Sequence, residues 1–269
     1  MIRTIALSLS VVLGLAPVAS MAQVPGPIGI TGAEFRLGFA TTDDDAQGSL
    51  GAVRDPGQDL ALTLGIAVVN VAITEHHGLQ GDLNFEDTAE GALGRIGGHL
   101  FLTPNEDHKY GVFGVIADVD DEGISYALGG VEGLLALNDR SLIELRAGLG
   151  IAIEEDLDLI FLGAAYIHEF RPGLIGQAGI EIAEFDELNF SAIGTEYSVG
   201  LTYQHQTSPW GAFGELVYSD LTGTDAAPGE LSVRAGLRFQ LGQRAGITPA
   251  TRYFRTPDPV AQLLRRGLF

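Results

Sequence analysis

The sequence has 269 residues, of which 37 are glycine and none is cysteine, and its formal net charge is −20. A chain without cysteine has no disulfide to stabilise it, and so acidic a chain is a poor partner for nucleic acid or for an anionic membrane surface. The high glycine content is typical of barrels whose strands bend and pack closely.

The first 22 residues have the pattern of a secretory signal peptide. A short basic start, Met1-Ile2-Arg3, leads into an apolar run over residues 5–18 and a small-x-small end at Ala22. The run is shorter than the ~20 residues of a membrane-spanning helix, which is the alternative interpretation. We therefore expect an exported protein cleaved after Ala22. A Pro/Gly-rich periplasmic lead-in over residues 23–32 should follow, without regular structure.

Twelve later segments alternate apolar and polar residues with a period of two, which indicates β-strands with one apolar face. In the clearest of them, residues 231–241, Arg234 and Arg238 lie on the polar face. Arginine is costly inside a dry sandwich core, but it suits the inside of a barrel whose apolar face looks at lipid. In chain order, the predicted strands are residues 33–41, 59–74, 77–86, 92–103, 109–119, 124–137, 141–154, 157–170, 174–184, 191–206, 210–219 and 231–241.

Two of these strands depart from simple alternation. In residues 124–137 two apolar pairs are out of phase, so we expect a β-bulge near Gly129-Gly130. The pairs are Tyr126 and Leu128 against Leu135 and Leu137. Residues 157–170 are apolar on both faces apart from His168, which favours a partly filled lumen or a contact with another barrel.

Acidic residues gather at every second connection between the predicted strands. Runs such as Asp43-Asp44-Asp45 fall in these connections, whereas His76, Arg140 and Arg171 fall in the others. Membrane barrels have an even strand number and alternate long external loops with short periplasmic turns. The acidic connections are therefore predicted to be external.

The segment after the last strand, residues 243–269, is basic where the rest of the chain is acidic. It holds five arginines against the single acid Asp258, and three prolines interrupt it. We predict a basic periplasmic tail, irregular except for a short helix at residues 260–266.

The signal peptide, the alternating strands and a closing strand with Phe239 near its end together resemble the porin-like bacterial outer-membrane β-barrels. The resemblance covers nearly all of the mature chain. It implies an all-β fold, a single transmembrane antiparallel up-and-down β-barrel of about 12 strands over residues 33–242. It also implies the outer membrane of a Gram-negative cell, with outer-membrane lipid, lipopolysaccharide and the barrel assembly machinery as partners. In such barrels a C-terminal aromatic serves as the assembly signal, and here Phe239 and Phe269 are both candidates.

The inward positions of the predicted strands are rich in charge. They are expected to form either a constriction that selects ions in transport, or a network of ion pairs that fills the lumen. A twelve-stranded barrel lies between the solidly packed and the open kinds, so strand number alone leaves both alternatives open. The candidate pore-lining residues are Glu34, Arg36, Arg95, His99, Glu144, Arg146, Glu181, Glu196, Glu215, Arg234 and Arg238.

The acidic connections suit hard cations, because clustered carboxylates bind Ca²⁺ and Mg²⁺. No run has the spacing of an EF-hand, so we predict a weak cation rim rather than a defined metal site, and no cofactor. The rim residues are Asp118, Asp120, Asp121, Glu154, Glu155 and Asp156.

An outer-membrane lipid-modifying hydrolase would need a nucleophile, a base and an orienting group. The sequence has no Gly-x-Ser-x-Gly motif, and the neighbours His168 and Glu169 point to opposite faces of a strand. The charged interior and acidic mouth favour a narrow, cation-preferring channel. A closed structural or surface-binding barrel without transport and the hydrolase remain alternatives.

Overall fold

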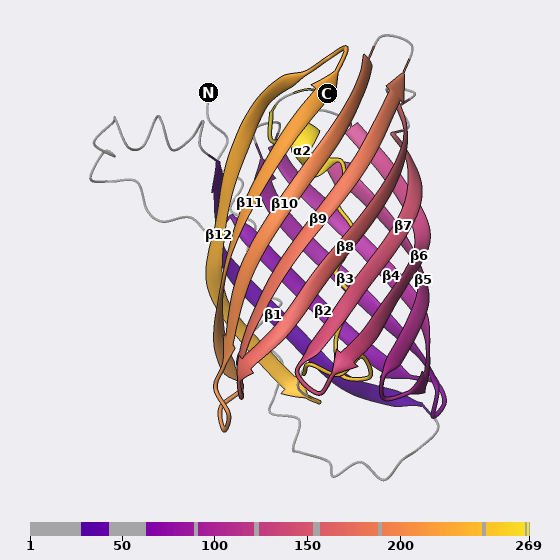
Figure 1. The fold of residues 1–269 in the computed structure, drawn as a ribbon, viewed down its shortest axis with the longest axis vertical. Coiled ribbons are helices and arrows are strands. Elements are labelled where there is room, and N and C mark those ends of the chain that lie inside the picture. Colours follow the sequence, from indigo (N-terminus) through magenta and orange to yellow (C-terminus); the bar gives the residue numbers. More distant parts are fainter. Residues whose placement is uncertain are drawn as a thin grey trace, which may run out of the picture.

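In the computed structural model, the described residues are 28–42, 63–88, 91–120, 124–152, 157–187, 190–243, 246–266 and 268. They form a closed barrel in which every strand pairs antiparallel with its sequence neighbours and the first strand pairs with the last (Figure 1). The strands are β1 (Gly29–Thr42), β2 (Leu64–Ala72), β3 (His77–Thr88), β4 (Gly91–Asn105), β5 (His108–Val119), β6 (Ile124–Asn138), β7 (Ser141–Ala152), β8 (Leu157–Arg171), β9 (Leu174–Glu187), β10 (Phe190–Gln204), β11 (Trp210–Gly223) and β12 (Ala227–Gly242). The prediction of a twelve-stranded, up-and-down, all-β barrel is confirmed.

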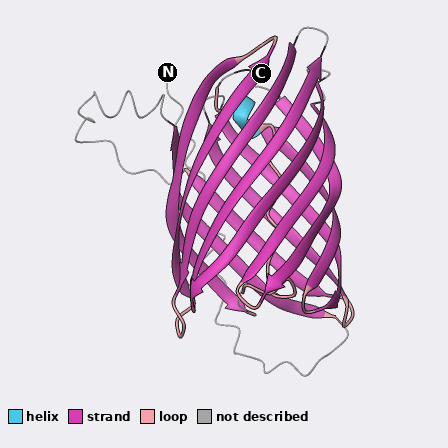
Figure 2. Cartoon of the chain, in the orientation of Figure 1, coloured by secondary structure: helices cyan, strands magenta, loops and turns pink. Residues whose placement is uncertain are grey.

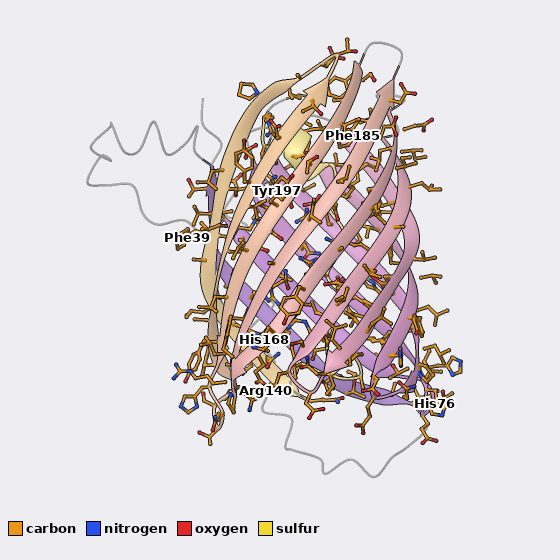
Figure 3. The ribbon with its side chains drawn as sticks, in the orientation of Figure 1. Phe39, His76, Arg140, His168, Phe185 and Tyr197 are labelled. Atoms are coloured by element: carbon orange, nitrogen blue, oxygen red, sulfur yellow. The ribbon has the colours of Figure 1, made fainter. Side chains whose placement is uncertain are left out.

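The period-two pattern gives the barrel wall two different faces. Outward side chains are apolar and exposed, as for Leu83 at 57%, Leu162 at 61% and Leu237 at 60%. Inward side chains between them are buried and include both polar and apolar groups. Figure 3 shows the outer side chains, with Phe39 among them, projecting from the wall. A continuous apolar outer face of this kind is the surface that lipid covers in a membrane barrel.

The strand bounds differ from prediction mainly at the ends of the closing pair. β1 begins at Gly29, inside the segment predicted as an irregular lead-in, because its first residues pair with Val71 and Ala72 of β2. β12 begins at Ala227, where it pairs with Leu221 of β11. The proposed cleavage site and most of the loop between β1 and β2 lie outside the described residues.

The bulge predicted near Gly129-Gly130 is wrong. Both glycines keep an unbroken register with β5 and β7, and the shift in β6 lies between Ala136 and Asn138, beside the turn. Tyr126 and Leu128 simply face the lumen and are buried there. They look out of phase with Leu135 and Leu137 because the lumen beside them is apolar, so both faces of this strand carry apolar residues.

The prediction of a periplasmic tail is also corrected. Residues 246–266, called the tail below, run inside the barrel from the end where β12 finishes to the opposite end (Figures 1 and 2). The helix α2 (Ala261–Leu264) lies within the range predicted for a short helix. Among the described residues, no helix is long and apolar enough to cross a membrane. The tail enters the lumen because its arginines and apolar residues find acidic and apolar partners there.

Candidate functional site

All eleven predicted pore-lining side chains face the lumen, where each is buried or ion-paired. They do not surround an open passage, because the tail occupies the space between them. A cavity of about 170 Å³ remains between wall and tail. Nine of the eleven line it, namely Glu34, Arg36, Arg95, Arg146, Glu181, Glu196, Glu215, Arg234 and Arg238. His99 and Glu144 instead contact the tail directly.

The middle of the tail is fixed around Phe254. Gln80 Nε2 donates to the Phe254 carbonyl at 2.8 Å, and the Phe254 N–H donates to Gln80 Oε1 at 2.9 Å. The ring stacks on His99, with centroids 5.7 Å apart, and Lys109 Nζ lies 4.5 Å from its centroid. Lys109 also donates to the Arg252 carbonyl at 2.9 Å. We call Gln80, His99, Lys109 and Phe254 the Phe254 clamp.

His99 connects the Phe254 clamp to two carboxylates. Its Nε2 lies 2.8 Å from Asp82 Oδ2 and its Nδ1 2.7 Å from Glu132 Oε1. Both ring nitrogens can donate only when the imidazole is protonated, so the two acids favour an imidazolium. Asp82 Oδ2 also accepts from Thr256 Oγ1 at 2.7 Å, which ties a tail residue two positions beyond Phe254 to the same carboxylate.

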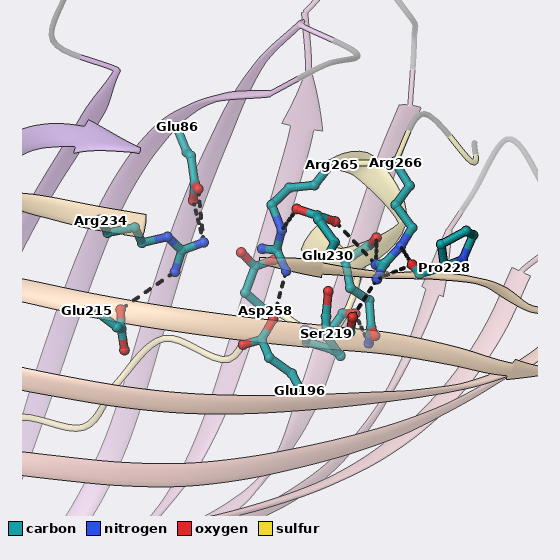
Figure 4. A network of polar contacts seen from close by, with 12 residues as sticks. Glu86, Glu196, Glu215, Ser219, Pro228, Glu230, Arg234, Asp258, Arg265 and Arg266 are labelled. Carbon is teal, nitrogen blue, oxygen red and sulfur yellow. Dashed lines mark hydrogen bonds and ion pairs between the residues drawn. The ribbon is translucent and has the colours of Figure 1, made fainter. Parts of the chain in front are cut away.

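Three tail arginines pair with wall acids. Arg266 Nη1 lies 3.4 Å from Glu230 Oε2, and the pairs of Arg255 and Arg265 lie at different heights in the lumen. Arg255 Nε lies 2.8 Å from Glu144 Oε2. Arg265 reaches both Glu196, at 2.8 Å, and Glu230, at 3.0 Å, as Figure 4 shows. Each contact of Arg255 and Arg265 is a charge-assisted hydrogen bond, which is stronger than one between neutral groups.

The end of the tail packs into apolar surroundings. Val260, Leu263 and Leu264 are almost completely buried in one hydrophobic cluster with inward residues of the wall. The wall residues in this cluster include Tyr126, Leu128, Leu157, Leu159 and Phe161. Asp258, just before α2, forms an ion pair with Arg95 and accepts from the Tyr126 hydroxyl at 3.0 Å. The end of the tail therefore packs against the apolar inner faces of β6 and β8.

The charges of wall and tail also match. Among the described residues, the wall turns nine acidic and six basic side chains into the lumen, besides His99. This is an excess of two negative charges when His99 is an imidazolium and of three when it is neutral. The tail adds four arginines and one aspartate, an excess of three positive charges. The wall acids are Glu34, Asp82, Glu86, Glu132, Glu144, Glu181, Glu196, Glu215 and Glu230, and the wall bases are Arg36, Arg95, Lys109, Arg146, Arg234 and Arg238. The tail charges are Arg252, Arg255, Arg265, Arg266 and Asp258. The tail thus neutralises the lumen it fills.

No protein-family model matches this sequence, and no curated protein matches it. Solved structures do match. The KdgM porin in complex with disordered oligogalacturonate is 10% identical with a TM-score of 0.51, over 77% of this chain and 98% of that one. The KdgM porin without that ligand gives a TM-score of 0.50 over the same shares at the same identity. The chain has the fold of the porin-like outer-membrane β-barrels. The predicted resemblance is confirmed at the level of the fold.

The predicted cation rim of this porin-like barrel lies mostly outside the described residues, which include only Asp118 and Asp120 of the six. Asp118 accepts a hydrogen bond from Ser125 Oγ at 2.8 Å. Within the described ranges, no group of three or more histidine, aspartate or glutamate side chains is arranged to hold a metal ion.

The histidine considered for a hydrolase lies at the end of the barrel with the short turns, as Figure 3 shows. His168 Nδ1 lies 2.9 Å from Ser141 Oγ and 3.5 Å from the Tyr166 hydroxyl. Its neighbour Glu169 accepts the backbone N–H of Gly173 at 3.0 Å instead. The carboxylate of Glu169 therefore does not orient this serine–histidine pair.

Two features of the site were not found from the sequence. Gln80 and Lys109 were not candidates, and the tail was not expected to contribute side chains to the lumen. The only signals in the sequence were the apolar inner faces of β6 and β8 and the opposite charges of wall and tail.

Proposed function

We propose that this protein is a porin-like channel of the outer membrane whose lumen is closed by its own C-terminal tail. The observation that carries the proposal is the match between the tail and the lumen, in charge and in apolar surface. The fold and the apolar outer face support a membrane location. Outer-membrane lipid and lipopolysaccharide would cover that face, the assembly machinery would insert the barrel, and Ca²⁺ or Mg²⁺ would gather at the acidic connections.

The wall without the tail supports a preference for cations. Its lumen would carry an excess of two negative charges among the described residues with His99 protonated, and of three with His99 neutral. A narrow passage with low-dielectric walls focuses such a charge and raises the local concentration of cations. Movement of the tail therefore both widens the passage and makes it acidic.

A second candidate function is a permanently closed barrel with a structural or surface-binding role. The deep burial of Val260, Leu263 and Leu264 favours it, because each buried leucine or valine contributes about 1.5–3 kcal/mol toward holding the tail in place. The two candidates differ in whether the tail ever leaves.

A reversible disulfide between the tail and the wall distinguishes the two candidate functions, and the experiment uses the full-length chain. A side chain placed at Gly194 in β10 would meet the side-chain amide of Gln262 in the tail. The chain has no cysteine of its own, so the pair Gly194→Cys and Gln262→Cys forms the only disulfide. In planar bilayers we expect cation-selective current from the wild type and the reduced variant, and silence from the oxidised variant.

A matched control carries Val199→Cys and Leu216→Cys, two outward residues that pair across β10 and β11 without touching the tail. Its current should not depend on reduction. A wild type that is silent under every condition, although folded as judged by heat-dependent gel mobility, would support the closed barrel instead. Equal current from oxidised and reduced forms of the tail crosslink would refute closure by the tail.

A further inference from the structure

One corner of the lumen gathers more positive charge than the wall and tail neutralise. Glu34 Oε1 accepts from Arg36 Nε at 2.5 Å, and Glu34 Oε2 accepts from Arg238 Nη2 at 2.5 Å and from Gln240 Nε2 at 2.7 Å. Arg252 of the tail lines the same cavity as Glu34, Arg36 and Arg238. Two guanidinium groups thus share the carboxylate of Glu34, and a third lines the same cavity.

The other acids that line this cavity each contact an arginine outside this corner. Glu181 pairs with Arg146 at 2.8 Å, Glu196 with Arg265 at 2.8 Å and Asp258 with Arg95, whereas Glu215 lies 3.9 Å from Arg234, which is closer to Glu86. Seven arginines and five acids line the cavity, which leaves an excess of two positive charges among the described residues.

One of the three guanidinium groups has unused hydrogen-bonding capacity, and another has a neutral partner. Arg238 is 1% exposed, and its Nε and Nη1 have no hydrogen-bond partner within the described part of the chain. Arg252 is 8% exposed, and its side chain donates to the neutral amide oxygen of Gln177 at 3.2 Å. The charges of Arg238 and Arg36 repel Arg252, and those of Glu144 and Glu34 attract it. Buried cations are normally paired, so this arrangement is costly unless an anion joins it.

We propose that the cavity beside Arg36, Arg238 and Arg252 binds a small carboxylate-bearing solute. Guanidinium groups are suited to this ligand, because their N–H groups match the spacing of carboxylate oxygens and form charge-assisted hydrogen bonds with them. The cavity of about 170 Å³ limits the solute to a few non-hydrogen atoms.

The site is formed by both the wall and the tail, so a bound anion affects how firmly the tail is docked. Arg36 and Arg238 belong to β1 and β12, whereas Arg252 belongs to the tail, so the anion bridges the two. A ligand that binds only the docked arrangement stabilises it by mass action. The carboxylate therefore keeps the tail in the lumen. This coupling rests on the proposed function, but binding itself does not.

The test uses the full-length folded protein in detergent and acetate as the probe. Sodium acetate or sodium chloride is titrated from a low-salt buffer while thermal unfolding is followed. Acetate should stabilise the wild type with saturation and more strongly than chloride. Arg252→Gln should weaken acetate binding roughly tenfold or more, as expected for the loss of one charge-assisted hydrogen bond.

Arg266→Gln is the matched control, because it removes the same charge from the tail but from a position that pairs with Glu230 at 3.4 Å and does not line the cavity. It should keep the acetate response. At low salt it should also be less stable than Arg252→Gln, which relieves repulsion rather than breaking a pair. Line broadening of ¹³C-labelled acetate by the wild type gives a second measurement that needs no variant.

An equal acetate response in the wild type and Arg252→Gln, or no line broadening, would overturn the site. Chloride as effective as acetate would overturn its assignment to carboxylates. Because neither measurement needs current, a protein that is silent in bilayers but binds acetate would contradict the channel and leave the site standing.

Discussion

The two halves of the tail are held in the lumen by different forces. Residues 252–256 bind through the hydrogen bonds of the Phe254 clamp and the Arg255–Glu144 pair, and the buried ring of Phe254 adds apolar contacts with the wall. Residues 260–266 bind through Val260, Leu263 and Leu264, which the wall covers almost completely, and Arg265 adds two ion pairs at the edge.

The difference shows which half controls release. A polar group of the tail that leaves the wall loses little free energy, because water replaces the hydrogen bonds that are lost. An apolar side chain of the tail has no such compensation, because exposing leucine to water is unfavourable. We therefore expect the α2 half to act as the anchor and the clamped half to move first.

The largest expected effect comes from placing a charge in the anchor. Leu264→Asp should cost about 4 kcal/mol or more of tail docking, because it removes a buried leucine and leaves a carboxylate without a partner. Channel open time should rise steeply, and the tail should become a target for added protease. Leu264→Met, which keeps the volume and apolar character, should behave as the wild type. A closed channel in Leu264→Asp would show that α2 is not the anchor.

A smaller effect is expected from the clamp. Phe254→Ala removes the ring contacts with His99, Phe101 and Lys109 but leaves both backbone hydrogen bonds to Gln80. It should cost about 3 kcal/mol, at the lower end for a phenylalanine truncation because a cavity already lies nearby. Protease should cut near residues 252–256 while residues 260–266 stay protected. Simultaneous loss of protection in both halves would mean that the tail docks as one cooperative unit.

The contrast between barrel and tail also separates what the sequence predicts from what it does not. Strands are recognised because alternation is a local property, and most predicted bounds lie within a few residues of the observed ones. The inward orientation of Arg95, Glu144 and Arg238 follows from the same alternation. Each of these predictions needs only neighbouring residues.

The place of the tail depends on contacts between residues far apart in the chain. Gln80 and Phe254 are separated by 174 positions, and the sequence around either residue does not indicate that the two are in contact. The signals that existed were indirect. The positions of Tyr126 and Leu128 suggest a bulge if only the lipid-facing side of a strand can be apolar. They fit a regular strand because α2 provides apolar surroundings inside the barrel.

A moderate effect is expected from removing one acid of the clamped half. Glu144→Gln deprives Arg255 of its ion pair but keeps a hydrogen-bond acceptor in place. Because Arg255 is about a quarter exposed, water compensates part of the loss, and about 1 kcal/mol is expected. Channel openings should become about five times more frequent. Asp118→Asn, on an exposed rim hydrogen bond, is the control and should leave the frequency unchanged.

The smallest expected effect is that of salt, and it acts on one half only. Raising ionic strength from about 0.1 M to about 1 M shortens the screening length from ~10 Å to ~3 Å, which weakens the partly exposed Arg255–Glu144 pair. Apolar burial of Leu263 and Leu264 does not weaken under the same change. Amide hydrogen exchange should therefore rise about two- to threefold in residues 252–256 and stay constant in residues 263–264. Equal increases in both segments would mean that ion pairs, including those of Arg265, anchor α2 as well, and the distinction between an apolar anchor and a polar clamp would fail.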